Sequence, residues 1–124
     1  MNQNLELKLS IRLFTEEHQR CFGPGVATLL EQVAAHHSLR AAAAAMEMAY
    51  SKAWRIIRTA EESLGCKLLD STIGGKHGGG AALTSEARQL LSAYRTYQAD
   101  VEAYAQQKFE SSFLELLSDA SESK

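Results

Sequence analysis

The segment that decides the fold spans residues 38–65 and reads SLRAAAAAMEMAYSKAWRIIRTAEESLG. Ser38 is a favourable helix N-cap, and the alanines at 41–45 belong to the residue type with the highest helix propensity. The pattern breaks at 47–49, and a longer helix then runs to Gly65, a residue type that commonly follows the last helical position. A short helix, a tight turn and a longer helix in this order predict a helix-turn-helix unit.

Two elements are expected before this segment. Over residues 5–13 apolar and polar residues alternate strictly, and a period of two is typical of a strand with one apolar face. Glycine and proline at 23–25 then interrupt the chain, and apolar residues from Val26 recur at helical spacing to about His37. The sequence therefore predicts a strand, a break and a first helix.

A hairpin and a long helix are expected after it. Leucines 68–69 and residues 81–83 flank a glycine-rich segment, which is typical of two strands joined by a long tip. Thr84 or Ser85 is placed to cap a last helix that we expect to reach about Leu117, before a frayed polar tail. The element order predicts a mostly α fold with a small β hairpin, namely a winged helix-turn-helix over residues 1–84, a dimerisation helix over 85–117 and a disordered tail over 118–124.

The composition narrows the class of protein. The chain of 124 residues is long enough for one domain, and 45% of its residues are hydrophobic, which predicts a folded core rather than disorder. Two cysteines are too few for a disulfide scaffold. No apolar run has the length of a membrane span, and the first residues lack a signal-peptide pattern. We therefore expect a cytoplasmic protein that does not contact a membrane.

The net charge is −2, but the charges are unevenly distributed along the sequence. Residues 38–83 carry six basic and four acidic side chains, whereas residues 84–124 carry four basic and seven acidic ones. Within the longer helix, Lys52, Arg55 and Arg58 follow one another without an acid between them. A helix with one buried and one basic face fits the major groove of DNA, and the alternative is an ordinary solvated face.

The same helix is expected to separate its basic residues from its apolar ones. We expect the three cations to share a flank with Ser51, opposite Trp54. The predicted inner side comprises Ala53, Trp54, Ile57, Ala60, Glu61 and Leu64.

The most unusual segment is the glycine-rich run of residues 74–80, GGKHGGG. It does not match a phosphate-binding loop, because Lys76 is followed by His77 in place of Ser or Thr, and it also lacks the glycine spacing of a dinucleotide site. What remains is a hairpin tip that presents these two side chains to a DNA backbone or minor groove as a wing. The alternatives are a loop without a ligand and an anion-binding nest.

The sequence contains no arrangement typical of an enzyme or a metal site. The four histidines and two cysteines lack metal-ligand spacing, and no local signature of a nucleophile is present. We expect no catalytic activity, no metal and no cofactor.

The last helix carries a heptad pattern. Apolar and aromatic residues recur at steps of 3, 4, 3, 4 and 3, which is typical of a helix that packs along a partner helix. The alternative is packing on the chain's own core, but the seam is longer than one small domain is expected to cover, so the pattern predicts a homodimer. The seam comprises Ala87, Leu90, Tyr94, Tyr97, Val101 and Tyr104.

Residues 38–70 resemble the helix-turn-helix of LysR-type transcription regulators. Residues 5–105 are more similar to the N-terminal domain of molybdate-responsive, ModE-type regulators, and this resemblance implies a DNA-binding winged helix in a bacterial regulator. The LysR-type similarity lies in Ser38 with Ala42 and Ala43, in Glu61 with Leu64-Gly65, and in Leu68-Leu69. The ModE-type similarity lies in Met48–Trp54 (MAYSKAW), in the wing Gly74–Ala81 (GGKHGGGA) with Leu83-Thr84, and in the entry Phe22–Gly25 (FGPG) with Leu29-Leu30.

Three positions depart from these families. Ala49 stands where ModE-type proteins have a serine N-cap, Lys52 lies one position later than their lysine, and Ser71 stands where LysR-type proteins usually have arginine. These differences leave the operator sequence open. ModE-type regulators bind molybdate in a separate C-terminal domain, so we expect no molybdate site in this chain.

Together these patterns predict a homodimeric, sequence-specific, DNA-binding transcription regulator. The helix of about residues 49–64 is expected in the major groove, and the hairpin of about 69–83 on the backbone or minor groove. The alternatives are a winged-helix module for protein interaction without DNA readout and an oxyanion-sensing domain. The predicted DNA contacts are Arg40, Tyr50, Ser51, Lys52, Arg55, Arg58, Lys76 and His77, and the predicted dimer contacts are Leu90, Tyr94, Tyr97, Val101 and Tyr104.

Overall fold

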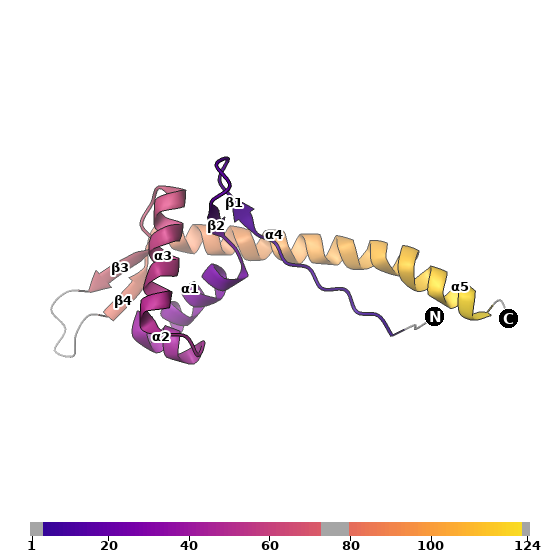
Figure 1. The fold of residues 1–124 in the computed structure, drawn as a ribbon, viewed down its shortest axis with the longest axis horizontal. Helices are drawn as coiled ribbons and strands as arrows, with labels where there is room; N and C mark the ends of the chain where they lie inside the picture. Colours follow the sequence, from indigo (N-terminus) through magenta and orange to yellow (C-terminus); the bar gives the residue numbers. More distant parts are fainter. Residues whose placement is uncertain (1–3, 73–79, 123–124) are drawn as a thin grey trace. The chain divides into compact units, whose positions relative to one another are not determined.

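The structure is a computed structural model that describes residues 4–72 and 80–122. The chain divides into two compact units, one comprising residues 11–94 and the other the residues before and after them. The prediction of a mostly α fold with a small β hairpin is confirmed. The elements are β1 (Leu13–Phe14), β2 (Arg20–Phe22), α1 (Pro24–His36), α2 (Leu39–Ala45), α3 (Tyr50–Leu64), β3 (Leu69–Thr72), β4 (Gly80–Leu83), α4 (Ser85–Phe109), a π-helical segment (Glu110–Leu114) and α5 (Glu115–Glu122) (Figure 1).

The helix-turn-helix is formed by α2 and α3. Ser38 caps α2, because its hydroxyl accepts a hydrogen bond from the Ala41 amide at 3.0 Å. α3 begins after Ala49, which has no side chain that can cap the helix. It ends at Gly65, which lies in the left-handed region at φ +72°, a conformation that glycine adopts without a steric penalty. The predicted boundaries of both helices are confirmed.

The core of the unit of residues 11–94 lies between α1, α2 and α3. Leu29, Leu30 and Val33 of α1 are fully buried, and each contributes roughly 1.5–3 kcal/mol before the entropy of ordering is subtracted. Most of the buried residues of α2 and α3 are alanines, whose small side chains let the helices approach closely. The same buried cluster includes Ala42, Ala43, Ala53, Ile57, Ala60 and Leu68.

The wing is an antiparallel hairpin of β3 and β4, which pair along their whole lengths. Thr84 closes its base: its hydroxyl donates a hydrogen bond to the Lys67 carbonyl at 2.7 Å. The same oxygen accepts a hydrogen bond from the Ala87 amide at 3.0 Å and so caps α4. Of the two caps considered from the sequence, Thr84 is the one that forms, because one hydroxyl serves both the hairpin and the helix.

The strand predicted over residues 5–13 is wrong for most of its length. Only its last residue joins Phe14 in β1, and residues 4–12 adopt no regular secondary structure. Leu5 and Leu9 are 45% and 38% exposed. An alternating segment becomes a strand only where a neighbour supplies hydrogen-bond partners, and β2, the strand that pairs with β1, is three residues long.

The first part of α4 belongs to the core of the same unit. Leu90 packs against that core, and Tyr94 is 5% exposed. The Tyr94 ring lies against Phe22, with centroids 5.1 Å apart, and its hydroxyl donates a hydrogen bond to the Ile11 carbonyl at 2.7 Å. The first half of the predicted heptad seam therefore packs within the chain itself.

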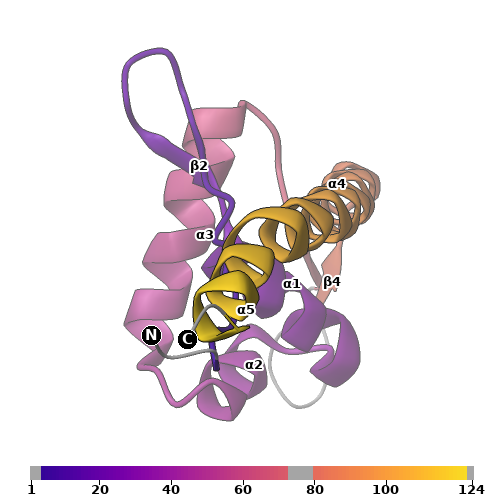
Figure 2. The ribbon, with the colours of Figure 1, turned by 90° about the vertical axis from the view of Figure 1, so that its right-hand side faces the viewer.

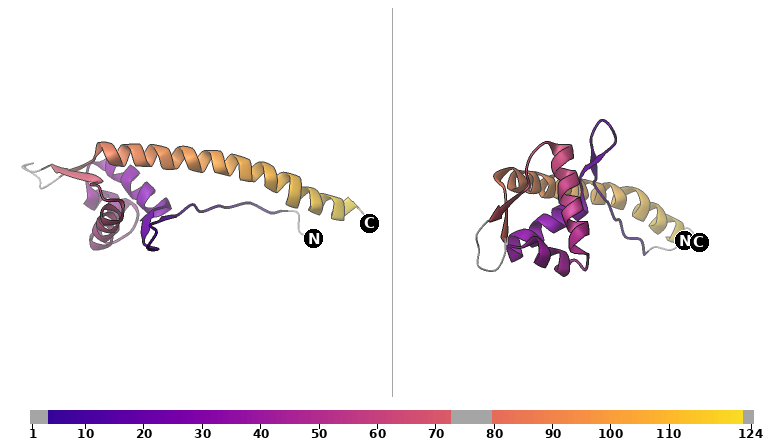
Figure 3. Two further views of the ribbon diagram at one scale, coloured as in Figure 1. Left: turned by 90° about the horizontal axis from the view of Figure 1, so that it is seen from above. Right: turned by 60° about the vertical axis from the view of Figure 1, so that its left-hand side comes forward.

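The two tyrosines in the second half of the seam are exposed. Tyr97 and Tyr104 are 59% and 62% exposed. α4 continues through the π-helical segment into α5 (Figure 3), and α5 extends to Glu122, past Leu117, where we expected the helix to end. Among the described residues, no helix combines the length and the apolar character that crossing a membrane requires.

Candidate nucleic-acid interface

The candidate interface is built on α3, which has a buried and an exposed side. Ala53, Ile57 and Ala60 are each at most 3% exposed, so the positions on the other side of the helix face solvent. The five contacts that the sequence predicts on α3 are all exposed, namely Tyr50, Ser51, Lys52, Arg55 and Arg58.

Trp54 does not lie on the buried side, and the sequence interpretation is wrong here. Its side chain is 40% exposed, and the guanidinium carbon of Arg58 lies 4.9 Å from the centroid of its ring. Successive residues of a helix are turned by about 100°, so the position after the buried Ala53 points out of the core. Arg58 and Trp54 therefore share one side of α3, instead of facing opposite ways.

Arg40 of α2 makes the same kind of contact with Tyr50, the first residue of α3. Its guanidinium carbon lies 4.2 Å from the centroid of the ring, and Tyr50 is 36% exposed. Exposed cation–π contacts contribute about 0.5–1 kcal/mol and orient both partners. The helix-turn-helix thus presents two arginine–aromatic pairs on its solvent side.

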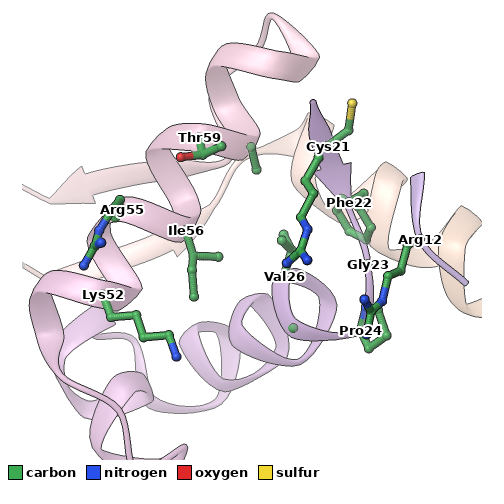
Figure 4. Close-up of a pocket in the computed structure, with 13 residues that line it drawn as sticks. Arg12, Cys21, Phe22, Gly23, Pro24, Val26, Lys52, Arg55, Ile56 and Thr59 are labelled. Atoms are coloured by element: carbon green, nitrogen blue, oxygen red, sulfur yellow. The ribbon is translucent and has the colours of Figure 1, made fainter. Parts of the chain in front are cut away.

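Lys52 and Arg55 lie on the opposite flank of α3. They line a cavity of about 490 Å³ together with residues of β2 and of the first turn of α1, and β2 lies beside α3 (Figure 2). In Figure 4, Lys52 extends from α3 toward the opposite wall, where Arg12 lies. Arg58 is not among the residues that line this cavity, so the three cations of α3 do not share one flank.

Two further basic residues of this cavity, Arg12 and Arg20, were not predicted from the sequence. Both line the cavity with Lys52 and Arg55. They come together because β1 pairs with β2, with Phe14 opposite Arg20. The only signal in the sequence is one arginine on each side of a short hairpin, which by itself does not say that either lies near α3.

Lys76 and His77, the predicted contacts of the wing, lie outside the described residues. The strands that carry the tip end at Thr72 and begin again at Gly80. Among the described residues, no group of three histidine, cysteine, aspartate or glutamate side chains is placed to hold a metal ion.

Residues 27–88 match the family of bacterial regulatory helix-turn-helix proteins of the lysR family. The match covers half of the chain, and it extends from α1 through the helix-turn-helix and the hairpin into the start of α4. The chain belongs to this family. Its helix-turn-helix is therefore the DNA-binding unit of a bacterial transcription regulator, as the sequence predicted.

The chain is also similar to three proteins, two of which have molybdenum in their names. The molybdenum transport protein ModE of Herbaspirillum seropedicae is 36% identical over 93 residues, which cover 75% of this chain and 31% of that protein. The transcriptional regulator ModE of Haemophilus influenzae is 32% identical over 92 residues, or 74% of this chain and 35% of that protein. The molybdenum-pterin-binding protein MopB of Rhodobacter capsulatus is 33% identical over 73 residues, or 59% of this chain and 27% of that protein.

The chain spans about a third of the length of these relatives. Its similarity to the N-terminal domain of ModE-type regulators, which the sequence motifs indicated, is confirmed.

Proposed function

We propose that this lysR-family chain acts as a homodimer, with α3 in the major groove of duplex DNA and the β3–β4 hairpin on the backbone or minor groove. The strongest support is the exposed side of α3. It carries Lys52, Arg55 and Arg58, and the sequence has no acid between Met48 and Glu61. Arginine and lysine on such a helix contact phosphates and guanine edges.

The two arginine–aromatic pairs support the same assignment. Tyr50 and Trp54 hold the guanidinium groups of Arg40 and Arg58 beside their rings. A restrained arginine loses less side-chain entropy when it binds than a free one does. Both rings lie in the first part of α3, and the first part of a recognition helix is the part that meets base edges.

We place the dimer contact on α4 after Tyr94. Tyr97 and Tyr104 are more than half exposed, and Val101 between them is half-buried. A second copy of this seam covers these side chains in a two-fold arrangement, which sets two α3 helices about one DNA turn or a multiple of it apart and predicts an inverted-repeat operator. Leu90 and Tyr94 pack on the core of their own chain, so we assign them to the support of α4 and not to the contact.

The test combines selection of sequences from a random duplex pool with titration of labelled duplexes followed by fluorescence anisotropy. We expect retention of duplex DNA at low salt and enrichment of an inverted repeat. Replacing Lys52 and Arg55 by alanine weakens binding, and the slope of log affinity against log salt flattens by about 0.9 for each phosphate contact that is lost. Arg88→Ala, at an exposed position of α4, is the matched control and leaves binding unchanged.

An alternative function is protein interaction without DNA readout. The net charge of −2 and the excess of acids after residue 84 favour it. This alternative replaces our proposal if the wild-type chain binds no duplex even at low salt. It also replaces our proposal if Lys52→Ala with Arg55→Ala binds as the wild type does while its circular dichroism spectrum is unchanged.

A further inference from the structure

The cavity beside α3 is lined by basic residues of α3, of β2 and of the segment just before β1. Its volume is about 490 Å³, and its lining includes Arg12, Arg20, Lys52 and Arg55 but no acidic residue. Arg20, Lys52 and Arg55 form no ion pair with a carboxylate that the structure describes. Arg20, Lys52 and Arg55 are like charges that line one cavity, so they repel one another, and an anion bound there reduces that repulsion.

The first turn of α1 adds donors to the same cavity. Gly23 is the N-cap residue and has no side chain that could bond to the free amides of the first turn. Pro24, the first residue of the helix, has no N–H. The amides of Gly25 and Val26 have no carbonyl partner within the helix, as is general for the first turn, and both residues line the cavity. A Cβ atom added at Gly25 would meet no atom within 4 Å, so the space in front of this turn is open.

We propose that this cavity is a phosphate-binding site, and that it takes a phosphate group of the DNA backbone next to the bases that α3 contacts. This inference rests on the proposed function, because Lys52 and Arg55 belong both to the exposed side of α3 and to the cavity. Arginine side chains and the amides of a helix start are the groups that bind phosphate in proteins. The β1–β2 hairpin, through Arg20 and through Arg12 just before β1, then becomes a third DNA-contacting element beside α3 and the wing.

A free phosphate compound presents the same chemistry as a backbone phosphate. The DNA backbone is favoured because Lys52 and Arg55, which we assign to DNA contact, also line the cavity. The experiment therefore needs one arm for each source.

The variant that tests the site is Gly25→Glu, with Gly25→Gln as its matched control. The space at Gly25 accepts either side chain, and an acid in the first turn of a helix favours folding. The two side chains have the same shape, so they differ only in the charge that they place in the cavity. In the DNA arm we expect Gly25→Glu to bind a 20-base-pair duplex about 10-fold or more weakly than Gly25→Gln, since one phosphate contact is lost and one repulsive charge is gained, with a salt slope lower by about 0.9.

Arg20→Gln gives an independent check in the same arm. It removes a cation of the hairpin without touching α3, and we expect the same loss of about 0.9 in the salt slope. Arg88→Gln, on α4, removes one positive charge outside the cavity and should leave the salt slope unchanged.

In the second arm, inorganic phosphate is titrated against each variant at constant ionic strength, and the midpoint of thermal unfolding is followed. A rise in the midpoint of Gly25→Gln that is absent in Gly25→Glu shows that the site takes free phosphate. The proposal is overturned if Gly25→Glu and Gly25→Gln bind duplex equally well and phosphate shifts neither midpoint. If the wild-type chain binds no duplex at all, the proposed function fails, and the phosphate arm alone then decides whether the cavity binds anions.

Discussion

Ser38 and Ala49 occupy the same position relative to their helices, immediately before α2 and α3. Both have extended backbones, with φ −159° and ψ 129° at Ser38 and φ −65° and ψ 143° at Ala49. Only Ser38 has a hydroxyl, and it accepts a hydrogen bond from the Ala41 amide. The helix proposed to enter the major groove therefore starts without a side-chain cap, although its backbone already has the conformation that a capping residue needs.

Single substitutions at these two positions should shift stability in opposite directions. Ser38→Ala loses a cap and should lower the free energy of unfolding by about 0.5–2 kcal/mol, whereas Ala49→Ser gains one and should raise it by about 1 kcal/mol. The measurement is the urea midpoint at fixed protein concentration, with the denaturant slope checked for constancy. Ser92→Ala, at an exposed position inside α4, is the control, and there alanine should stabilise slightly because of its helix propensity. An unchanged midpoint for Ser38→Ala would contradict the role given to the cap.

At the scale of elements, the wing is anchored to the helices on both of its strands. The carboxylate of Glu61, in the last turn of α3, accepts hydrogen bonds from the amides of Leu68 at 2.8 Å and Leu69 at 3.4 Å. On the other strand, the Ala81 amide donates to the carbonyl of His37, which follows α1, at 3.0 Å. The base of the hairpin is therefore positioned relative to α3 and α1 before any ligand binds.

Removing the Glu61 carboxylate should loosen the base of the β3–β4 hairpin. Hydrogen bonds to a charged group contribute about 1.5–3 kcal/mol, so Glu61→Ala should lower the free energy of unfolding by about that amount and increase hydrogen exchange at the Leu68 amide. Glu61→Gln keeps an acceptor oxygen and should lose less. Glu62→Ala changes the neighbouring exposed carboxylate and serves as the control. If the Leu68 amide exchanges equally slowly in Glu61→Ala, another group protects it.

At the scale of the whole molecule, the first part of the α4 seam packs within its own chain, whereas the second part carries exposed tyrosines. Up to Tyr94 its residues belong to the core of the unit of residues 11–94, where Ala87 and Tyr94 are buried and Leu90 is partly buried. The tyrosines that follow in the same heptad register are exposed. Exposed aromatic residues in a heptad register fit a contact with a second helix, and this contact is the basis of the proposed dimer.

Two glutamates in the exposed seam should therefore produce a monomer. Tyr97→Glu with Val101→Glu places like charges across a symmetric contact, and sedimentation should show a folded monomer that binds DNA weakly and with strong salt dependence. Thr96→Glu with Ala99→Glu adds the same charge at exposed positions outside the seam and should remain dimeric. If the seam variant also sediments as a dimer, the contact lies elsewhere, for example along the N-terminal segment.

What the sequence determined by itself is local. The Ser38 cap, the glycine that ends α3 at Gly65 and the hairpin on either side of the glycine-rich run all depend on residues a few positions apart. Such interactions are specified by neighbouring side chains and backbone preferences, so reading them in order is enough to predict the helix-turn-helix. The exposure of Lys52, Arg55 and Arg58 followed in the same way from helical periodicity.

Only the tertiary structure decided which partner each exposed or apolar face would meet. Residues 5–12 alternate like a strand, but no strand within residues 4–72 and 80–122 pairs with them. The heptad residue Tyr94, by contrast, contacts Phe22 and the Ile11 carbonyl of its own chain. In the same way, Arg12 and Arg20 reach the cavity beside α3 only because β1 pairs with β2. Periodicity specifies the direction in which a side chain points, but the group that it meets there comes from residues distant in sequence, and their positions are set when the core packs.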